Sequence, residues 1–554
     1  MAAARVLENL VFRAAMATQG RASATRMLAS ARDPFAAQSR LLASIVADGR
    51  QTAFGWAHGY EGVKNLDDFR AAVPIGDYEA RRPWIDRQIA GETAVTTETP
   101  VMYARTSGTT GAPKMIPITP SVLAGLRRAQ RAASAFQHRA CPMFDGRILA
   151  LGGAKREETL AGGVPCGSVT GLIYETMPAV VRAKYIVPPE VFAIEDPGLK
   201  YAVVTRLALQ HADMTAVSTA NPSTFLRLRD YARAHWCELM AELETGAFAA
   251  AEALPADQAQ AVRSALRPSP GRAKALRAAA EIAEPTVAQL WPRLAGVVTW
   301  TGGSCALAAD AVRRSLDPGA RLIEAGYVAS EFRGSVIVDI EKALGLPLLD
   351  DVFFEFVHAS AWDAGRRDTL LLHELEEGED YQVIATTRGG LARYWINDIV
   401  RAGPCIGRTP SISFVRKGRG VTSITGEKLT ESQVTDALQE VAARFGLSVT
   451  FHVALADEAA GIYTLLLEAE GGEGAALGPA FDAALAVRNI EYESKRRSGR
   501  LGPPEVRRLR AGAGATYRGW CVSRGQRDAQ FKVMTLQYRQ ECAFAFAPWF
   551  SGRA

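Results

Sequence analysis

Hydrophobic residues recur at helical intervals in the first part of the chain. Near the N-terminus, they occupy the i, i+3 and i+4 positions of one helix face at Val6, Leu7, Leu10, Val11 and Ala14. Helical patterns dominate residues 1–70 and 120–140, and they also run through the Ala/Glu/Arg-rich stretch 222–290. Prolines interrupt that last stretch, and each proline ends or kinks a helix.

Short runs rich in β-branched residues predict strands. They occur at Arg147–Leu151, Val297–Thr301, Arg321–Ile323, Val336–Asp339, Val352–Val357, Thr369–Leu372, Tyr381–Thr387 and Ser411–Val415. Helices and strands alternate before about residue 340, which indicates α/β layers, whereas the closely spaced strands after it indicate a barrel-like or antiparallel sheet. The predicted fold class is therefore α/β.

The pattern changes beyond residue 420. Helices are predicted at Ser432–Phe445 and Pro479–Tyr492, and strands at Ser448–Ala456 and Tyr463–Glu470. The glycine-containing segment Arg416–Gly426 is a plausible hinge. We expect a large domain over residues 1–420 and a small α+β domain over residues 421–554.

Composition narrows the class of protein. The chain has 554 residues, of which 48% are hydrophobic and 22% charged, as in an ordinary globular protein. Its 64 basic and 59 acidic residues give a net charge of +5, too small an excess to indicate nucleic-acid binding. The sequence contains no run of 18 apolar residues, so no membrane span is predicted. Only 11 of the basic residues are lysines, so the position of each lysine is informative.

Cysteine and histidine usage bears on location and metal binding. The seven cysteines form no CxxC pair, and the seven histidines form no HExxH or other metal-ligand cluster. This usage is typical of reduced thiols in a cytoplasmic protein. The Arg- and Ala-rich first 30 residues faintly imitate a transit peptide, but the amphipathic helix pattern favours the cytoplasmic interpretation.

The most informative segment is a loop rich in glycine and hydroxyl groups. It contains Thr106, Ser107, Gly108, Thr109, Thr110, Gly111 and Lys114. Glycines let backbone N–H groups approach a phosphate, hydroxyls add donors, and an ammonium neutralises phosphate oxygens. The spacing differs from GxxxxGK[ST], so this is not a Walker A loop. A plain Gly/Thr turn is the alternative interpretation.

The sequence TSGTTGAPK looks like the phosphate-binding loop of the luciferase-like adenylate-forming superfamily. The continuation Met115–Thr119 (MIPIT) resembles the Gretchen Hagen acyl acid amido synthetases, the auxin-conjugating family with bacterial relatives. Flanking segments agree with this family, and the resemblance spans about residues 35–535. These flanking segments are Thr52–Gly55 (TAFG), Asp67–Tyr78 (DDFRAAVPIGDY), Phe353–Phe356 (FFEF) and Lys495–Arg500 (KRRSGR).

The resemblance implies that the cofactors are ATP and Mg²⁺. In the segment GYVASE, Tyr327 would stack on adenine, Ser330 would lie beside the phosphates, and Glu331 would be the metal ligand, since Mg²⁺ commonly takes one or two carboxylates plus phosphate oxygens. Asp398, in YWIND, would bind the ribose hydroxyls. The alternatives are a core tyrosine with a surface glutamate, and a solvated loop aspartate.

The segment YWIND departs from the family pattern YRxGD at two positions. Asn397 replaces glycine, a mild change because asparagine tolerates the left-handed conformation. Trp395 replaces arginine and removes a charge, which puts any phosphate- or carboxylate-binding role of that arginine in doubt. Arg393 or Arg388 is a candidate to compensate.

Three further basic residues match family positions. Arg416 corresponds to an arginine near the hinge, Lys428 to a lysine at the start of the small domain, and Lys532 to the catalytic lysine that reaches the α-phosphate and acyl carboxylate when this domain closes. Lys114 of the phosphate loop would act with them. The alternatives are a solvated basic turn for Arg416, a helix-terminus surface lysine for Lys428 and a strand-edge lysine for Lys532.

Gly302, Gly303 and Ser304 resemble the glycine turn that lines the acyl pocket. With Cys305 and Ala306 they nearly spell the hydrolase motif GxSxG, but the last glycine is absent and no triad order is evident, which disfavours a serine hydrolase. The basic run Lys495–Arg510 lacks interleaved aromatic residues and is interpreted as a solvated or domain-facing surface.

The resemblance thus implies a large α/β domain with a barrel-like part and a small mobile lid. The enzyme would convert a carboxylic acid and ATP to acyl-AMP and pyrophosphate, then transfer the acyl group to an amine, with an amino acid as the expected acceptor. We expect a monomer that binds neither nucleic acid nor membrane. An acyl-CoA ligase with the same first step and an inactive nucleotide-binding scaffold are the alternatives.

Overall fold

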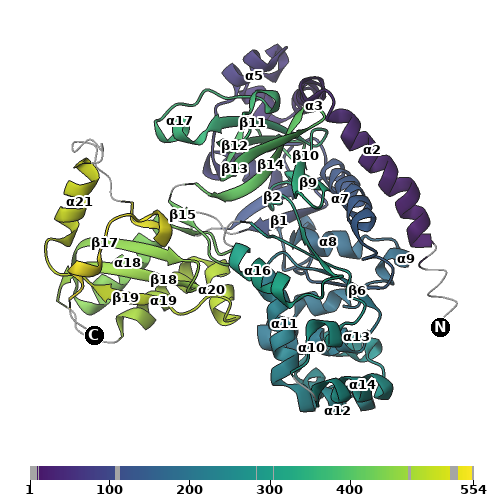
Figure 1. Ribbon diagram of the computed structural model, residues 1–554. Coiled ribbons are helices and arrows are strands. Elements are labelled where there is room, and N and C mark those ends of the chain that lie inside the picture. The colour runs from purple at the N-terminus through teal and green to yellow at the C-terminus, as the bar shows by residue number, and fades with distance from the viewer. Residues whose placement is uncertain are drawn as a thin grey trace. The chain divides into compact units, whose positions relative to one another are not determined.

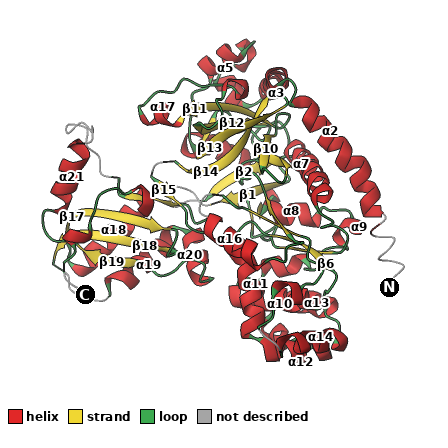
Figure 2. Cartoon of the chain, viewed as in Figure 1, coloured by secondary structure: helices red, strands yellow, loops and turns green. Residues whose placement is uncertain are grey.

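The protein is described by a computed structural model (Figure 1). It describes residue 9 and residues 11–106, 113–281, 284–302, 305–418, 420–471, 476–523 and 534–551. The chain divides into two compact units. The larger contains Met1–Thr106 and Lys114–Arg416, and the smaller contains Lys417–Ala554. Helices and strands occur in both units (Figure 2), in agreement with the predicted α/β class.

A parallel sheet forms one part of the larger unit. Its order is β3 (Arg147–Ala150), β6 (Met214–Ser218), β7 (Gly296–Thr299) and β8 (Arg321–Glu324). Alternate residues of these strands enter two different hydrophobic clusters, one of which includes the surrounding helices between residues 197 and 280. Burial on both faces explains why these strands are continuous apolar runs.

A second sheet carries the ends of the phosphate loop. Its order is β2 (Lys114–Ile118), β1 (Met102–Thr106), β5 (Pro165–Gly167) and β4 (Glu158–Thr159). Strands β1 and β2 are antiparallel, and Thr106 pairs with Lys114. This pairing places the two ends of the glycine-rich segment side by side.

A third sheet follows in the order β11 (Val352–His358), β12 (Asp380–Thr387), β13 (Tyr394–Ile406) and β14 (Thr409–Lys417). The first two pairings are antiparallel, as the sequence predicted for this region. The short strands β9 (Ser335–Asp339) and β10 (Leu344–Pro347) form a separate antiparallel pair.

Helices surround these sheets. The described helices of the larger unit are α2 (Arg21–Ser30), α3 (Pro34–Gly49), α4 (Ala53–Ala57), α5 (Leu66–Ala72), α6 (Tyr78–Ile89), α7 (Pro120–Ala140), α8 (Val169–Glu175), α9 (Ala179–Arg182), α10 (Pro197–Leu209), α11 (Pro222–Ala234), α12 (Trp236–Thr245), α13 (Ala256–Ala265), α14 (Pro270–Ala280), α15 (Val287–Leu290), α16 (Ala306–Ser315) and α17 (Ala359–Asp363). Several begin with a capping side chain followed by proline. In α7, for example, Thr119 accepts a hydrogen bond from the Val122 N–H.

The smaller unit is a sheet covered by helices on both faces. Its order is β19 (Glu505–Arg508), β18 (Ile462–Glu470), β17 (Ser448–Asp457) and β20 (Leu536–Tyr538). Helices α18 (Glu431–Phe445) and α19 (Leu477–Arg488) share one hydrophobic cluster with the sheet, and α21 (Ala513–Ser523) shares another. The strands β15 (Val421–Thr422) and β16 (Leu429–Thr430) form a small hairpin.

Two sequence predictions were wrong in detail. The single helix Pro479–Tyr492 is two helices, α19 and α20 (Ile490–Arg497), because the Asn489 side chain caps the second one at the Tyr492 N–H. Thr369–Leu372 forms only one bridge, between Leu370 and Phe356, and is no strand. Strand β13 was not predicted, although it is the longest strand in the larger unit among the described residues.

Two further observations concern the cysteines and the lengths of the helices. All seven cysteines are free, and four of them are buried. Over the part of the chain that the structure describes, we find no helix with the length and apolar character needed to cross a membrane.

Candidate active site

Lys114 is the centre of a buried polar cluster in the larger unit. It is the first residue of β2, where pairing with β1 fixes its backbone. Its ammonium donates a hydrogen bond to the Tyr394 hydroxyl at 3.0 Å and lies 3.7 Å from Oε1 of Glu331. The ammonium also lies 5.7 Å from the ring centres of Tyr78 and Tyr394, within cation–π range. The side chain therefore has a defined position next to the phosphate loop.

Glu331 is the carboxylate of this cluster and is only 4% exposed. The Tyr394 hydroxyl donates to Glu331 Oε1 at 3.1 Å. Burial, and then the charge of Glu331, raise the pKa of Tyr394 well above its usual value. Tyr394 therefore stays protonated at neutral pH. Its hydroxyl accepts a hydrogen bond from Lys114 and donates one to Glu331, and so links the two charged groups.

A second contact joins Tyr327 and Asp398. The Tyr327 hydroxyl donates to Asp398 Oδ2 at 2.8 Å, and Asp398 is 2% exposed. Burial, followed by the Asp398 charge, raises the pKa of Tyr327 well above the ordinary value. The close packing of this tyrosine requires Gly334, because a Cβ there would lie 2.2 Å from Tyr327 Cδ1. The predicted nucleotide residues Tyr327 and Asp398 thus lie together.

A bulge in β13 sets the position of Asp398. Ile384 of β12 pairs with Trp395, whereas Gln382 pairs with Ile399, so β13 has two extra residues in this interval. Asn397 lies in the bulge with φ +59°, in the left-handed region. This confirms the expectation that asparagine here takes over the conformational role of glycine.

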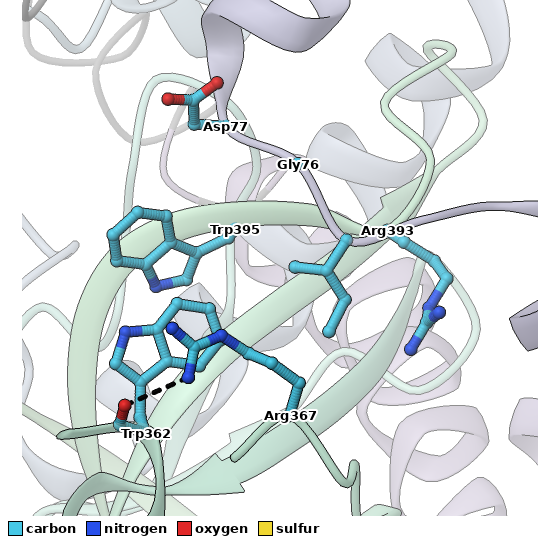
Figure 3. A pocket seen from close by; sticks show the side chains of 7 residues that line it. Gly76, Asp77, Trp362, Arg367, Arg393 and Trp395 are labelled. Atoms are coloured by element: carbon cyan, nitrogen blue, oxygen red, sulfur yellow. Dashed lines mark hydrogen bonds between the residues drawn. The ribbon is translucent and has the colours of Figure 1, made fainter. Parts of the chain in front are cut away.

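Trp395 points away from this cluster. It follows Tyr394 on β13, and consecutive strand residues project to opposite faces. Its ring centre lies 4.7 Å from that of Trp362, and its Nε1 donates to Gln382 Oε1 at 2.9 Å. The Arg367 guanidinium covers Trp362 at 3.7 Å. Trp395, Trp362, Arg367 and Asp77 are among the residues that line a pocket of about 450 Å³ (Figure 3). Replacing arginine by Trp395 therefore removes no charge from the Lys114–Glu331 face.

Neither proposed compensating arginine belongs to the cluster. The Arg393 guanidinium makes a two-pronged ion pair with buried Glu355, at 2.9 and 3.1 Å. Arg388 donates to Ser44 and Asp48. Each guanidinium is bound in a structural contact elsewhere in the larger unit, so neither contacts Lys114 or Glu331 in this structure.

The donor set fits a cation that takes most of its ligands from a substrate. No group of three or more His, Cys, Asp or Glu side chains able to hold a metal occurs in the described ranges. Glu331 offers one carboxylate next to Lys114. A site of this kind suits Mg²⁺ bound through one carboxylate and phosphate oxygens, rather than a site built only from protein ligands.

The remaining predicted site residues are distributed over both units. In the larger unit, Gly302 follows β7 after a short loop, Ser330 directly precedes Glu331, and Arg416 lies near the end of β14. Lys428 is in the smaller unit with φ +50°, a strained conformation for a non-glycine residue. Thr106 ends β1 and is buried. Outside the described residues lie Ser107, Gly108, Thr109, Thr110, Gly111, Gly303, Ser304 and Lys532.

Two tyrosines of the cluster were missed as site residues. Tyr78 exchanges hydrogen bonds with the backbone of Met115, next to Lys114, and Tyr394 joins Lys114 to Glu331. Both occur in segments that carried the family resemblance. The signal that could have identified Tyr394 is its position at the start of the segment that ends in Asp398.

Comparisons with known proteins cover most of the chain. The GH3 family N-terminal domain model matches residues 23–318, the central domain model residues 345–417, and the C-terminal domain model residues 432–541. The chain is 25% identical over 538 residues to a probable indole-3-acetic acid-amido synthetase, GH3.1, of Oryza sativa subsp. japonica, covering 90% of this chain and 86% of the relative. It is 24% identical over 551 residues to the jasmonoyl–L-amino acid synthetase GH3.5 of the same plant, covering 91% and 92%.

Solved structures agree with the fold. The acyl acid amido synthetase AtGH3.15, in complex with 2,4-DB, superposes with a TM-score of 0.66 at 20% identity, covering 94% of this chain and 95% of that chain. Another structure of the GH3.15 synthetase gives a TM-score of 0.63 at 19% identity, with the same coverage. The resemblance and the fold class predicted from the sequence are confirmed.

Proposed function

Because this chain belongs to the GH3 family, we propose that it is an ATP-dependent acyl acid amido synthetase. It adenylates a carboxylic acid and transfers the acyl group to an amine, most simply the amino group of an amino acid. The observation that carries this proposal is the Lys114–Tyr394–Glu331 cluster at the end of the phosphate loop, with Tyr327 and Asp398 held together in the same unit.

In the first half-reaction, a carboxylate oxygen of the acid forms a bond to the α-phosphorus of ATP, and the bond to the α,β-bridging oxygen breaks. Pyrophosphate leaves and acyl-AMP remains. Lys114 supplies a fixed positive charge for the phosphate oxygens, and Tyr394 keeps that charge in place. Glu331 is the residue that would hold Mg²⁺, which neutralises phosphate charge when bound.

In the second half-reaction, the amine nitrogen attacks the acyl carbon, the carbon–oxygen bond to AMP breaks, and the amine loses a proton. AMP is a far better leaving group than the hydroxide of a free acid. By family resemblance, Tyr327 contacts adenine, Ser330 the phosphates and Asp398 the ribose. Arg416, Lys428 and Lys532 keep the roles predicted from their positions. Residues 421–554 act as the lid in this proposal, which treats the enzyme as cytoplasmic and monomeric.

The test is product analysis of the purified enzyme with ATP, a panel of carboxylic acids, and either pooled amino acids or coenzyme A. We expect AMP and pyrophosphate in amounts that depend on the acid, with an amide product only when amino acids are present. Lys114→Ala should abolish the reaction. An acyl thioester with coenzyme A would instead identify an acyl-CoA ligase, and ADP with phosphate would refute adenylation.

A further inference from the structure

Arg333 is a fixed cation close to the candidate active site. It lies two residues after Glu331, so the two Cα atoms are within about 7 Å of each other. The Arg333 Nη1 donates to Gln130 Oε1 at 3.1 Å, and its Nε donates to the Ser335 carbonyl at 3.3 Å. Gln130 lies on α7 and is itself oriented by a 3.3 Å bond to Ser134 Oγ. The guanidinium is therefore held in one place.

Both acceptors that hold Arg333 are neutral. Among the described residues, Arg333 forms no ion pair with a carboxylate, and both of its hydrogen bonds go to uncharged oxygens. Some arginines of this unit are paired with carboxylates, since Arg128 contacts Asp351 at 2.6 Å and Arg393 is paired with Glu355, whereas Arg272, like Arg333, bonds to neutral carbonyl oxygens. Burying part of a guanidinium that has no carboxylate partner costs desolvation free energy. An anion that binds from solution would offset this cost.

The surface beside Arg333 suits an organic molecule. Val328 forms an isolated antiparallel bridge with Arg333, and residues opposite each other in such a bridge present their side chains on the same side. Val328 is 38% exposed, although it is apolar and directly follows the buried Tyr327. An apolar side chain and a fixed cation thus adjoin each other, three residues before and two residues after Glu331 in the chain.

We propose that Arg333 binds a second anionic group of the acyl substrate, which is therefore a dicarboxylic acid. This inference rests on the proposed function. The two protein bonds use Nε and Nη1, which leaves Nη2 as the donor for the substrate. The reacting carboxylate is the poorer partner for two reasons. A guanidinium bound to it would stabilise the nucleophile before reaction, and adenylation would remove its charge. The second carboxylate stays ionised through both half-reactions.

The experiment compares acids that differ only in the second carboxylate: adipate with hexanoate, and isophthalate with benzoate. AMP formation gives kcat/KM for each acid with the wild-type enzyme, Arg333→Met and Arg333→Lys. We expect the wild type to prefer the dicarboxylate of at least one pair. Arg333→Met should lower kcat/KM for that dicarboxylate about 10- to 100-fold, the range for a charged hydrogen bond, and change the monocarboxylate less than about twofold. Arg333→Lys should retain part of the preference.

Two further variants separate recognition from folding. Arg131→Met removes an exposed arginine of the same helix α7 and should leave the preference unchanged. Gln130→Ala keeps the guanidinium but removes its anchor, and should weaken the preference to an intermediate degree. Equal losses for both members of a pair in Arg333→Met, or a wild type that prefers the monocarboxylates, would overturn the inference while the proposed function stands.

A binding measurement keeps the inference separate from the proposed function. If no acid supports AMP formation, the proposed function fails, and calorimetric titration of adipate and isophthalate into the wild type and Arg333→Met decides the inference. Binding that is lost in Arg333→Met would support a dicarboxylate site. Binding that is absent in both proteins, or equal in both, would refute it.

Discussion

Restoring the family arginine at position 395 should destabilise the protein without improving nucleotide binding. Trp395→Arg removes the contact with Trp362 at 4.7 Å and the 2.9 Å hydrogen bond to Gln382. An aromatic pair contributes about 0.5–1.5 kcal/mol and a neutral hydrogen bond about 1 kcal/mol. The new cation would also share a pocket with Arg367 and Arg393. We expect the free energy of unfolding of the larger unit to fall by about 2 kcal/mol.

The assay has two readouts, the guanidinium chloride unfolding midpoint and the KM for ATP. Trp395→Phe is the matched control, because it keeps an aromatic ring against Trp362 but loses the N–H, and should cost about 1 kcal/mol. The KM for ATP should stay within about twofold in both variants, since the side chain points away from Lys114. A Trp395→Arg enzyme that binds ATP several-fold more tightly, or that is as stable as the wild type, would refute the placement of this residue.

Three other changes have defined outcomes. Tyr327→Phe removes the donor to buried Asp398 and should raise the KM for ATP about tenfold; an unchanged KM would separate this pair from nucleotide binding. Lys428→Gly should relieve the φ of +50° and stabilise the smaller unit by about 1 kcal/mol in thermal unfolding, while AMP formation falls; unchanged activity would show that the lysine has no role in turnover. Burial raises the pKa of Tyr78 and Tyr103 to about 12. Since these folded values exceed the unfolded value of about 10, stability should be complete below pH 10 and decrease as the pH rises toward 12. Equal urea midpoints at pH 8.5 and pH 11 would contradict this.

The sequence predicted those parts of the site whose chemistry lies in short motifs. Lys114 was identified from its place after the glycines, and the structure places it next to Glu331, a residue more than two hundred positions away in the chain. Most strands of the parallel sheet were also predicted, because burial on both faces leaves continuous apolar runs. Beyond residue 420, helix α18 and strands β17 and β18 were predicted from the alternating helix and strand patterns.

Other features depend on contacts that a pattern does not contain. Strand β13 alternates in burial over its first residues, but its bulge interrupts the pairing with β12, and the strand was not predicted. Arg393 was a reasonable candidate for phosphate binding until the structure showed its pairing with Glu355, a partner 38 residues away. The helix break at Asn489 depends on one side-chain cap, which a helical pattern cannot distinguish from a surface asparagine.

Tyr394 lies in a motif that the sequence identified, but its role depends on a contact that the sequence pattern does not contain. Its segment was recognised, yet its function depends on the bond to Lys114 at a sequence distance of 280 residues. A propensity argument treats the residue as an ordinary buried tyrosine. The contact with a charged pair is what distinguishes it, and that contact exists only in the folded unit.

The most direct test of the central claim is acid-dependent exchange of labelled pyrophosphate into ATP in the absence of any amine. This exchange reports reversible acyl-AMP formation alone, independent of the acyl acceptor. We predict exchange that requires both a carboxylic acid and Lys114, and that falls at least tenfold in Tyr394→Phe while the fold is retained. An enzyme that exchanges no pyrophosphate with any acid, or that exchanges equally well without Lys114, would contradict the account.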